Sequence, residues 1–211
     1  VSGASPNSPH TVYVDGTLMG DGPIGDLTAG GTVDPGNAPA TVSTLECGAV
    51  QLEGFGSMKV HMTAVEGTPG TDWDLINSYA GITVSGSGTF TIQPMGNPAG
   101  FNPTNSYSWK IMSGVSPVSG YAANRFTINS SGFEPDMEGG QFGVTAIGND
   151  LYLTFTTGGG IPVWDGEGGD TKWDTAENWV GDIVPTNTKT VVFYTGLDSG
   201  SIIDLNGNRT A

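Results

Sequence analysis

Glycine constrains this chain more than any other feature, with 35 glycines and 13 prolines among 211 residues. The glycines separate short runs of β-branched and aromatic residues, such as residues 11–14 and 89–92. Glycine adopts the positive φ angles of tight turns without steric cost. The pattern therefore predicts short strands and turns from end to end. Five Trp, six Tyr and eight Phe argue against disorder, and no 3.6-residue period predicts a long helix.

The first third of the sequence is the most repetitive. Strand-length pieces of three to five residues alternate with turns rich in Gly, Asp and Asn, a spacing typical of a β-solenoid. From residue 57 to 65 the apolar residues alternate strictly, which predicts a half-exposed strand with His61 on its polar face. Further strand-like runs follow, and Asn149-Asp150 is predicted to form the turn of a hairpin.

These patterns predict an all-β fold with a right-handed β-helix, or β-solenoid, section and additional antiparallel, β-sandwich-like strands. We expect residues 1–65 to form solenoid coils. Residues 66–157 form a β-rich middle section that either continues the solenoid or folds as a sandwich. Three consecutive glycines at 158–160 mark a boundary. Residues 158–211 are expected to form a Trp-rich β segment that opens a next unit or contacts a neighbouring copy.

The charge balance excludes several classes of partner. The formal net charge is −15, from 21 acidic and six basic side chains that never cluster. Nucleic acids and anionic membrane surfaces would repel such a chain, so neither nucleic-acid binding nor membrane insertion is expected. No signal peptide or transmembrane stretch is visible, and we interpret the chain as a mature or excised piece of a longer protein. Acidity at this level serves solubility alone in the simpler interpretation, and it also fits an exported protein that takes up calcium.

The single cysteine, Cys47, cannot form a disulfide within the chain, and no zinc-binding pattern surrounds it. Its apolar neighbours indicate a strand position, so a buried, inert thiol is the first interpretation. An intermolecular disulfide is the extracellular alternative.

Several short motifs occur in the order found in one family of surface proteins. They comprise residues 18–25 with 30–37, residues 70–76, 108–112 and 149–154, and finally Trp164, Trp173, Asn178, Trp179 and Pro185. This series resembles the autotransporter-associated β-strand repeat proteins. The resemblance implies a large secreted or surface-displayed right-handed β-helix. The motif that opens such units lies here after the closing strand, which implies one period of a tandem array or a subunit that meets its next copy end to end.

Two motifs suggest enzymatic chemistry, and both have a simpler interpretation. Residues 20–25 fit the G-x-G-x-x-G pattern, but a dinucleotide site needs a helix after it, and residues 26–31 indicate a strand and a turn. Glycoside cleavage needs two carboxylates at a fixed separation. The candidates are Glu134, Asp136 and Glu138, or the acidic residues 165–174. Because these acids lie in glycine-rich loops, we interpret them as solvated, and we assign no catalytic or cofactor-binding residue.

Two further groups are candidates for ligand binding. Asp165, Glu167 and Asp170 offer oxygen ligands on a flexible glycine loop, which suits the tolerant geometry of calcium. Trp164, Trp173 and Trp179 form a cluster in sequence that either stacks against sugar rings or caps the end of a solenoid. The capping interpretation is the one we favour.

The sequence thus predicts an extracellular structural protein, a building block of a surface fibre, stalk or sheath. Its partners would be copies of itself, added head to tail by β-strand pairing, because exposed sheet edges invite such pairing. The termini near residues 1–14 or 191–205 are expected to make these contacts. A carbohydrate-binding adhesin that contacts surface polysaccharide is the alternative, followed by a polysaccharide-degrading β-helix enzyme.

Overall fold

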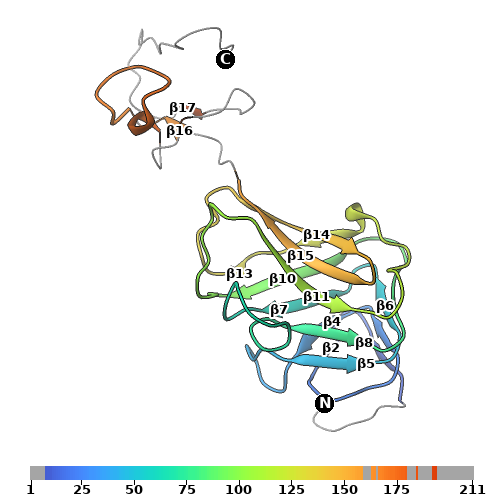
Figure 1. The fold of residues 1–211 in the computed structure, drawn as a ribbon. Helices are drawn as coiled ribbons and strands as arrows, with labels where there is room; N and C mark the ends of the chain where they lie inside the picture. The colour runs from blue at the N-terminus through green and yellow to red at the C-terminus, as the bar shows by residue number, and fades with distance from the viewer. Residues whose placement is uncertain (1–7, 159–162, 165, 180–183, 185–191, 194–211) are drawn as a thin grey trace. The chain divides into compact units, whose positions relative to one another are not determined.

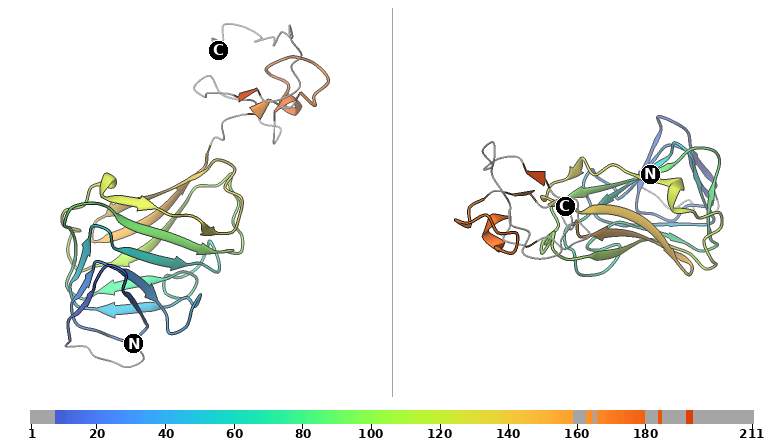
Figure 2. Two further views of the ribbon diagram at one scale, coloured as in Figure 1. Left: turned by 180° about the vertical axis from the view of Figure 1, so that it is seen from behind. Right: turned by 90° about the horizontal axis from the view of Figure 1, so that it is seen from above.

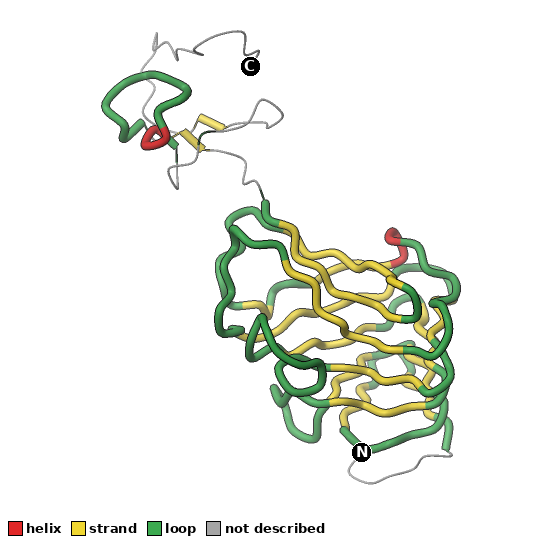
Figure 3. The backbone as a smooth tube through the Cα atoms, viewed as in Figure 1, coloured by secondary structure: helices red, strands yellow, loops and turns green. Residues whose placement is uncertain are grey.

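The computed structural model describes residues 8–158, 163–164, 166–179, 184 and 192–193. Within these residues the secondary structure is almost entirely β-strand (Figures 1 and 3), which confirms the all-β prediction. The helical turns of the described residues are two short 3₁₀ segments, η1 (Ala123–Arg125) and η2 (Ala176–Asn178). Two compact units are present: Val1–Asp136 with Gln141–Thr156, and Met137–Gly140 with Thr157–Ala211.

Three sheets make up the larger unit. In hydrogen-bonding order, the first sheet contains β1 (His10–Val12), β3 (Leu27–Ala29), β6 (Val50–Glu53) and β9 (Ile82–Ser85). The second contains β2 (Thr17–Gly20), β4 (Thr32–Pro35), β7 (Ser57–His61), β10 (Phe90–Gly96) and β12 (Phe126–Ile128), with β13 (Gly132–Phe133) also paired to β10. The third contains β5 (Thr44–Cys47), β8 (Leu75–Ser78), β11 (Tyr107–Ser113), β15 (Asp150–Thr156) and β14 (Gln141–Ile147).

From β3 to β11 the chain adds one strand to each sheet in turn and then returns to the first sheet. All strand pairs in the first two sheets are parallel, as are β5–β8 and β8–β11 in the third. The strands of each sheet therefore lie one above another (Figure 2). Each sheet contains strands from both sides of residues 65–66, so the sheets run on through the boundary expected there.

The core is built from apolar residues that face one another in register along each sheet. In the first sheet, Leu27 pairs with Val50, and Val50 pairs with Ile82. In the second sheet, Val33 pairs with Met58, and Met58 pairs with Ile92. All six side chains are buried. Because side chains alternate between the two faces of a strand, parallel in-register pairing stacks like residues and buries one apolar row per sheet.

Hydroxyl side chains form a matching row on the second sheet. Five residues are successive register partners across β2, β4, β7, β10 and β12: Thr17, Thr32, Ser57, Thr91 and Thr127. The Thr32 and Ser57 hydroxyls lie 3.0 Å apart, and those of Thr91 and Thr127 also lie 3.0 Å apart. These contacts give the hydroxyl groups hydrogen-bond partners on the neighbouring strand, because in-register pairing places like residues side by side.

The predicted antiparallel strands are present, and they extend the third sheet. β15 pairs antiparallel with β11 and with β14. The register of Ile147 opposite Asp150 leaves Gly148 and Asn149 as the two-residue turn, with Gly148 at φ +61°. The hairpin prediction is therefore confirmed, although Asp150 already belongs to the strand. A positive φ at the first turn position is what short hairpin loops require, and glycine provides it.

An ion pair links the start of β15 to β11. Lys110 Nζ lies 2.6 Å from Asp150 Oδ2, and Ser113 Oγ donates to Asp150 Oδ1 at 3.0 Å. Burial alone would raise the pKa of Asp150, but the hydrogen bonds from Lys110 and Ser113 outweigh it and hold this pKa below its ordinary value of 3.8. The ionised carboxylate is thus favoured by folding.

This arrangement predicts a specific pH dependence of stability. A lowered folded-state pKa contributes stability above about pH 4, and that contribution is lost as the pH falls through the lowered pKa. In Asp150→Asn the contribution is absent, so wild type and variant should differ in unfolding free energy at pH 7 and converge as the pH falls below 4. Urea titrations of both proteins between pH 2 and 7 measure this difference. A constant difference across the range would contradict the assignment.

Candidate functional site

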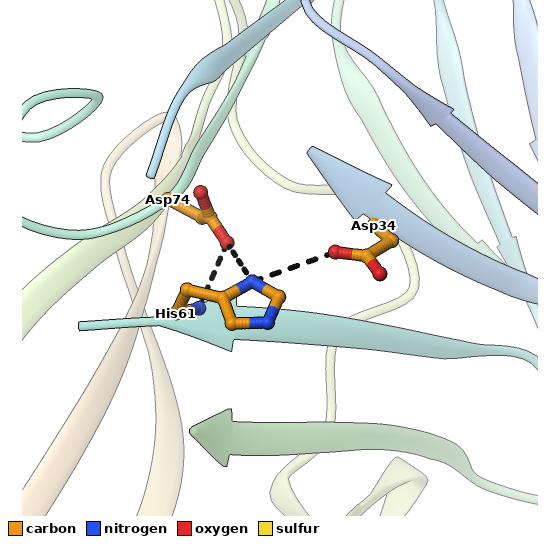
Figure 4. A group of neighbouring side chains, drawn as sticks. All are labelled: Asp34, His61 and Asp74. Carbon is orange, nitrogen blue, oxygen red and sulfur yellow. Dashed lines mark hydrogen bonds and ion pairs between the residues drawn. The ribbon is translucent and has the colours of Figure 1, made fainter. Parts of the chain in front are cut away.

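A buried Asp–His–Asp cluster is the most unusual polar feature of the larger unit. Asp34 comes from β4, His61 ends β7, and Asp74 immediately precedes β8 (Figure 4). His61 Nδ1 lies 3.0 Å from Asp74 Oδ2 and 3.4 Å from Asp34 Oδ1. Both carboxylates therefore point at one ring nitrogen. The relative exposures of the three residues are 1% for Asp34, 7% for His61 and 0% for Asp74.

The surrounding hydrogen bonds fix Asp74 firmly. Its Oδ1 accepts the Ser43 backbone N–H at 2.8 Å, and its Oδ2 accepts the His61 backbone N–H at 2.8 Å. Burial raises the pKa of Asp74 above its ordinary value, although the hydrogen bonds from His61 and Ser43 lower it in part. A buried carboxylate is expensive to keep ionised, so this position requires a nearby cation or shared proton.

Asp34 is satisfied less completely. Lys59 Nζ donates to its Oδ2 at 3.0 Å, but its Oδ1 is buried and has no hydrogen-bond partner. Lys59 itself is one-third exposed, so it reaches the cluster from the solvent side of the second sheet. The arrangement holds two carboxylates, one ammonium group and one imidazole, so it carries one excess negative charge when both carboxylates are ionised and the imidazole is neutral.

The sequence assigned His61 to the correct face of its strand, but the exposure expected for that face is wrong. The strict alternation around β7 put His61 on a half-exposed polar face, whereas four of the five β7 residues, His61 among them, are buried. The segment that follows β7 returns to the strand: Asp74 N–H donates to the His61 carbonyl at 3.1 Å, and Met62 pairs with Trp73. This return covers the polar side of the strand. Period-two alternation assigns a face but cannot reveal a later segment that packs on it.

The sequence reasoning also missed Asp34 and Asp74 as members of a site. Both lie within the motifs that suggested the family resemblance, and neither was assigned a role there. The one available signal was a histidine on a regular strand with isolated aspartates before and after it, and such a pattern is common on exposed surfaces. Only the pairing of β4 with β7 brings Asp34 to His61.

The three predicted tryptophans pack against each other in the smaller unit. Trp164 and Trp173 each meet the Trp179 ring edge to face, at centroid distances of 5.2 and 4.8 Å. All three rings are at most 6% exposed, and Trp179 Nε1 donates to the Trp173 carbonyl at 2.9 Å. They form a small apolar core together with Val184. Sugar stacking needs an exposed aromatic face, so the carbohydrate interpretation would require this cluster to open.

The predicted calcium ligands lie in the same unit, and Asp165 is outside the described residues. Glu167 is exposed. The Asp170 carboxylate accepts hydrogen bonds from Lys172 N–H, Thr175 Oγ1 and Asn178 Nδ2 at 2.9–3.0 Å. These bonds close the loop that leads into η2, which gives Asp170 a structural role. Calcium binding at Asp165, Glu167 and Asp170 stays a prediction.

The remaining candidates are placed as follows. Glu134, Asp136 and Glu138 are all exposed. β2 ends at Gly20 and β3 begins at Leu27, so the residue 20–25 motif joins two strands and precedes no helix. Cys47 is buried, as predicted, and burial, with the negative charges of Glu46 and Asp26, raises its pKa to about 12. Such a thiol is unreactive at neutral pH.

A surface cleft of about 470 Å³ lies beside residues 64–66 and 99–107, with Glu66, Asn105 and Tyr107 in its lining. Tyr107 is the aromatic residue of this lining, but it is stacked on both Phe101 and Trp109, at 5.5 and 5.2 Å. The Tyr107 ring therefore already has two stacking partners within the protein. The Asp34–His61–Asp74 cluster remains the stronger candidate site.

Comparison with known proteins gives no family, since no family model, no curated protein and no solved structure matches the chain. Among the described residues, no helix has both the length and the apolar character needed to cross a bilayer.

Proposed function

We propose that this chain is an extracellular structural protein, a building block of a surface fibre, stalk or sheath, whose larger unit is a right-handed β-solenoid. The observation that carries the proposal is the connectivity, in which the chain adds parallel, in-register strands to three sheets in rotation. Stacked coils of this kind produce that order of strands. Right-handed crossover is the expected hand, because parallel connections in one sheet are almost always right-handed.

The sheet ends suggest how copies would join. In every sheet the strand at one end comes early in the chain, namely β1, β2 or β5, and the strand at the other end comes late, namely β9, β12 or β14. The two ends of the unit are thus different surfaces. Pairing the late end of one copy with the early end of the next makes a head-to-tail contact, which repeats without closing and yields a filament.

The chemistry of the chain supports an external location. The net charge of −15 keeps copies soluble and apart until specific edges meet. The resemblance to autotransporter-associated β-strand repeats points the same way, and we propose surface display on that basis. Catalysis is not part of the proposal; the candidate acids Glu134, Asp136 and Glu138 lie exposed, as expected for solvated side chains. Surface polysaccharide remains the partner of the alternative, adhesin function.

An edge variant tests the proposal. His10 N–H donates to the Asp26 carbonyl and the Val12 carbonyl accepts from Gly30, so the backbone of the intervening Thr11 faces away from β3. Thr11→Pro removes that outward N–H and leaves the inward pairing of β1 intact. We expect the concentration at which wild type forms filaments to rise at least about tenfold in this variant.

The matched control is Thr11→Val, which keeps the N–H and the β-branched shape. It should assemble like wild type in sedimentation and negative-stain electron microscopy. Wild-type protein that stays monomeric at millimolar concentration would refute the proposed function. Equal assembly of Thr11→Pro and Thr11→Val would exclude β1 as the edge strand through which the copies join.

A further inference from the structure

Asp34 Oδ1 is buried without a hydrogen-bond partner, and both carboxylates of the cluster approach His61 Nδ1. A cation held between these three atoms would satisfy Asp34 Oδ1 and offset the negative charge. We propose that Asp34, His61 and Asp74 form a binding site for a divalent transition metal ion, with zinc as the preferred ion. The ligand atoms would be Asp34 Oδ1, His61 Nδ1 and Asp74 Oδ2. One potential ligand atom from each of the three residues lies within 4.8 Å of those of the other two. This inference is independent of the solenoid and of filament assembly.

The spacing of these atoms suits a small tetrahedral ion. Zinc–ligand bonds of 2.0–2.1 Å at tetrahedral angles separate neighbouring donor atoms by about 3.3 Å. His61 Nδ1 is 3.4 Å from Asp34 Oδ1 and 3.0 Å from Asp74 Oδ2. The distances from the imidazole nitrogen to the two carboxylate oxygens are therefore close to those between neighbouring ligand atoms around one zinc ion. An ion held there replaces the proton on Nδ1, and the proton leaves to solvent.

The donor set selects against other ions. An imidazole nitrogen suits zinc and its transition-metal neighbours, whereas calcium and magnesium prefer an all-oxygen shell of six or more ligands. The buried position gives calcium too few oxygens, because Asp34 Oδ2 is held by Lys59 and Asp74 Oδ1 by Ser43. Three protein ligands leave a fourth position for water.

Both carboxylate ligands are supported by further contacts, as metal ligands usually are. Asp74 is oriented by the backbone N–H groups of Ser43 and His61, and Asp34 is oriented by Lys59. The metal would join β4, β7 and the segment before β8 across two of the three sheets. Its effect is to clamp the return of residues 62–74 onto β7.

Zinc titration of the purified full chain tests the site. After chelation and dialysis, calorimetry at about 0.5 M NaCl should show one zinc ion bound per chain, since this salt screens weak binding to exposed carboxylates. Asp34→Asn should bind at least about tenfold more weakly. The matched control is Asp72→Asn in the same segment. The Asp72 carboxylate accepts an exposed hydrogen bond from the Thr68 N–H and does not belong to the cluster, so this variant should bind zinc like wild type.

Two further measurements keep the test decisive if Asp34→Asn does not fold. Co²⁺ added to wild type should give the visible d–d bands of a low-symmetry nitrogen and oxygen site, and His61→Gln should abolish them. Calcium should give no stoichiometric binding under the same conditions. The site is excluded if wild type binds no zinc at a tenfold molar excess. Equal zinc affinity of folded Asp34→Asn and Asp72→Asn would also exclude it.

Discussion

Replacing Trp109 by alanine should lower the free energy of unfolding by about 3–5 kcal/mol, the range found for removal of a buried large aromatic side chain. Trp109 is 1% exposed in β11 and is stacked on Tyr107 at 5.2 Å. Its Nε1 donates a buried hydrogen bond to the backbone carbonyl of Val65 at 2.9 Å. The change therefore removes apolar contacts, leaves a cavity and leaves the Val65 carbonyl without its hydrogen-bond donor.

Urea denaturation followed by far-UV circular dichroism measures this loss without depending on tryptophan emission. Trp109→Phe is the matched variant: it keeps most of the ring contacts but loses the hydrogen bond to Val65, so it should cost less than Trp109→Ala. Tyr13→Ala, at a residue 76% exposed, should change stability by less than about 0.5 kcal/mol. A loss below 1 kcal/mol in Trp109→Ala would contradict the packing of β11.

The second large effect is expected from Gly54→Ala, which should cost about 1–3 kcal/mol or more. A Cβ at this position would collide with the carbonyl oxygen of Ser87 and lie 2.6 Å from its carbonyl carbon. The obstacle is backbone from the next pass of the chain, which side-chain rotation cannot relieve. Gly54 thus lies in the connection after β6, at a point where the connection after β9 comes too close to leave room for any side chain.

Gly143→Ala provides the control, because its new Cβ would meet only the Thr154 hydroxyl at 3.3 Å. A small side-chain rotation accommodates that contact, and the lower entropy of the unfolded chain offsets it. Thermal unfolding of both variants should show a lower midpoint for Gly54→Ala and little change for Gly143→Ala. Equal midpoints would show that the connections after β6 and β9 do not approach each other as described.

The sequence predicted those parts of the fold that depend on neighbouring residues. Alternating apolar residues predicted strands at β7, β10 and β15, and Asn149-Asp150 predicted a tight hairpin turn, which the structure forms with Gly148 and Asn149. The burial of Cys47 followed from its apolar strand neighbours. Each of these depends on a few consecutive residues, whose backbone preferences operate without any distant partner.

The candidate site could not be predicted in the same way. Alternation gave His61 a correct face of its strand, but Asp74 and its neighbours return to cover that face. Asp34 reaches His61 only through the pairing of β4 with β7. The predicted ligands in the Trp-rich segment shared a local pattern of acids and glycines, yet the Asp170 carboxylate is used to close its own loop.

Composition and local pattern by themselves determined that this chain is β-rich and acidic, and they predicted a boundary at its three consecutive glycines. The tertiary structure decided which strand lies beside which, and hence that two aspartates and a histidine share a buried point. The physical reason is that turn and strand preferences act over a few residues, whereas stacking in register joins residues many positions apart through backbone hydrogen bonds.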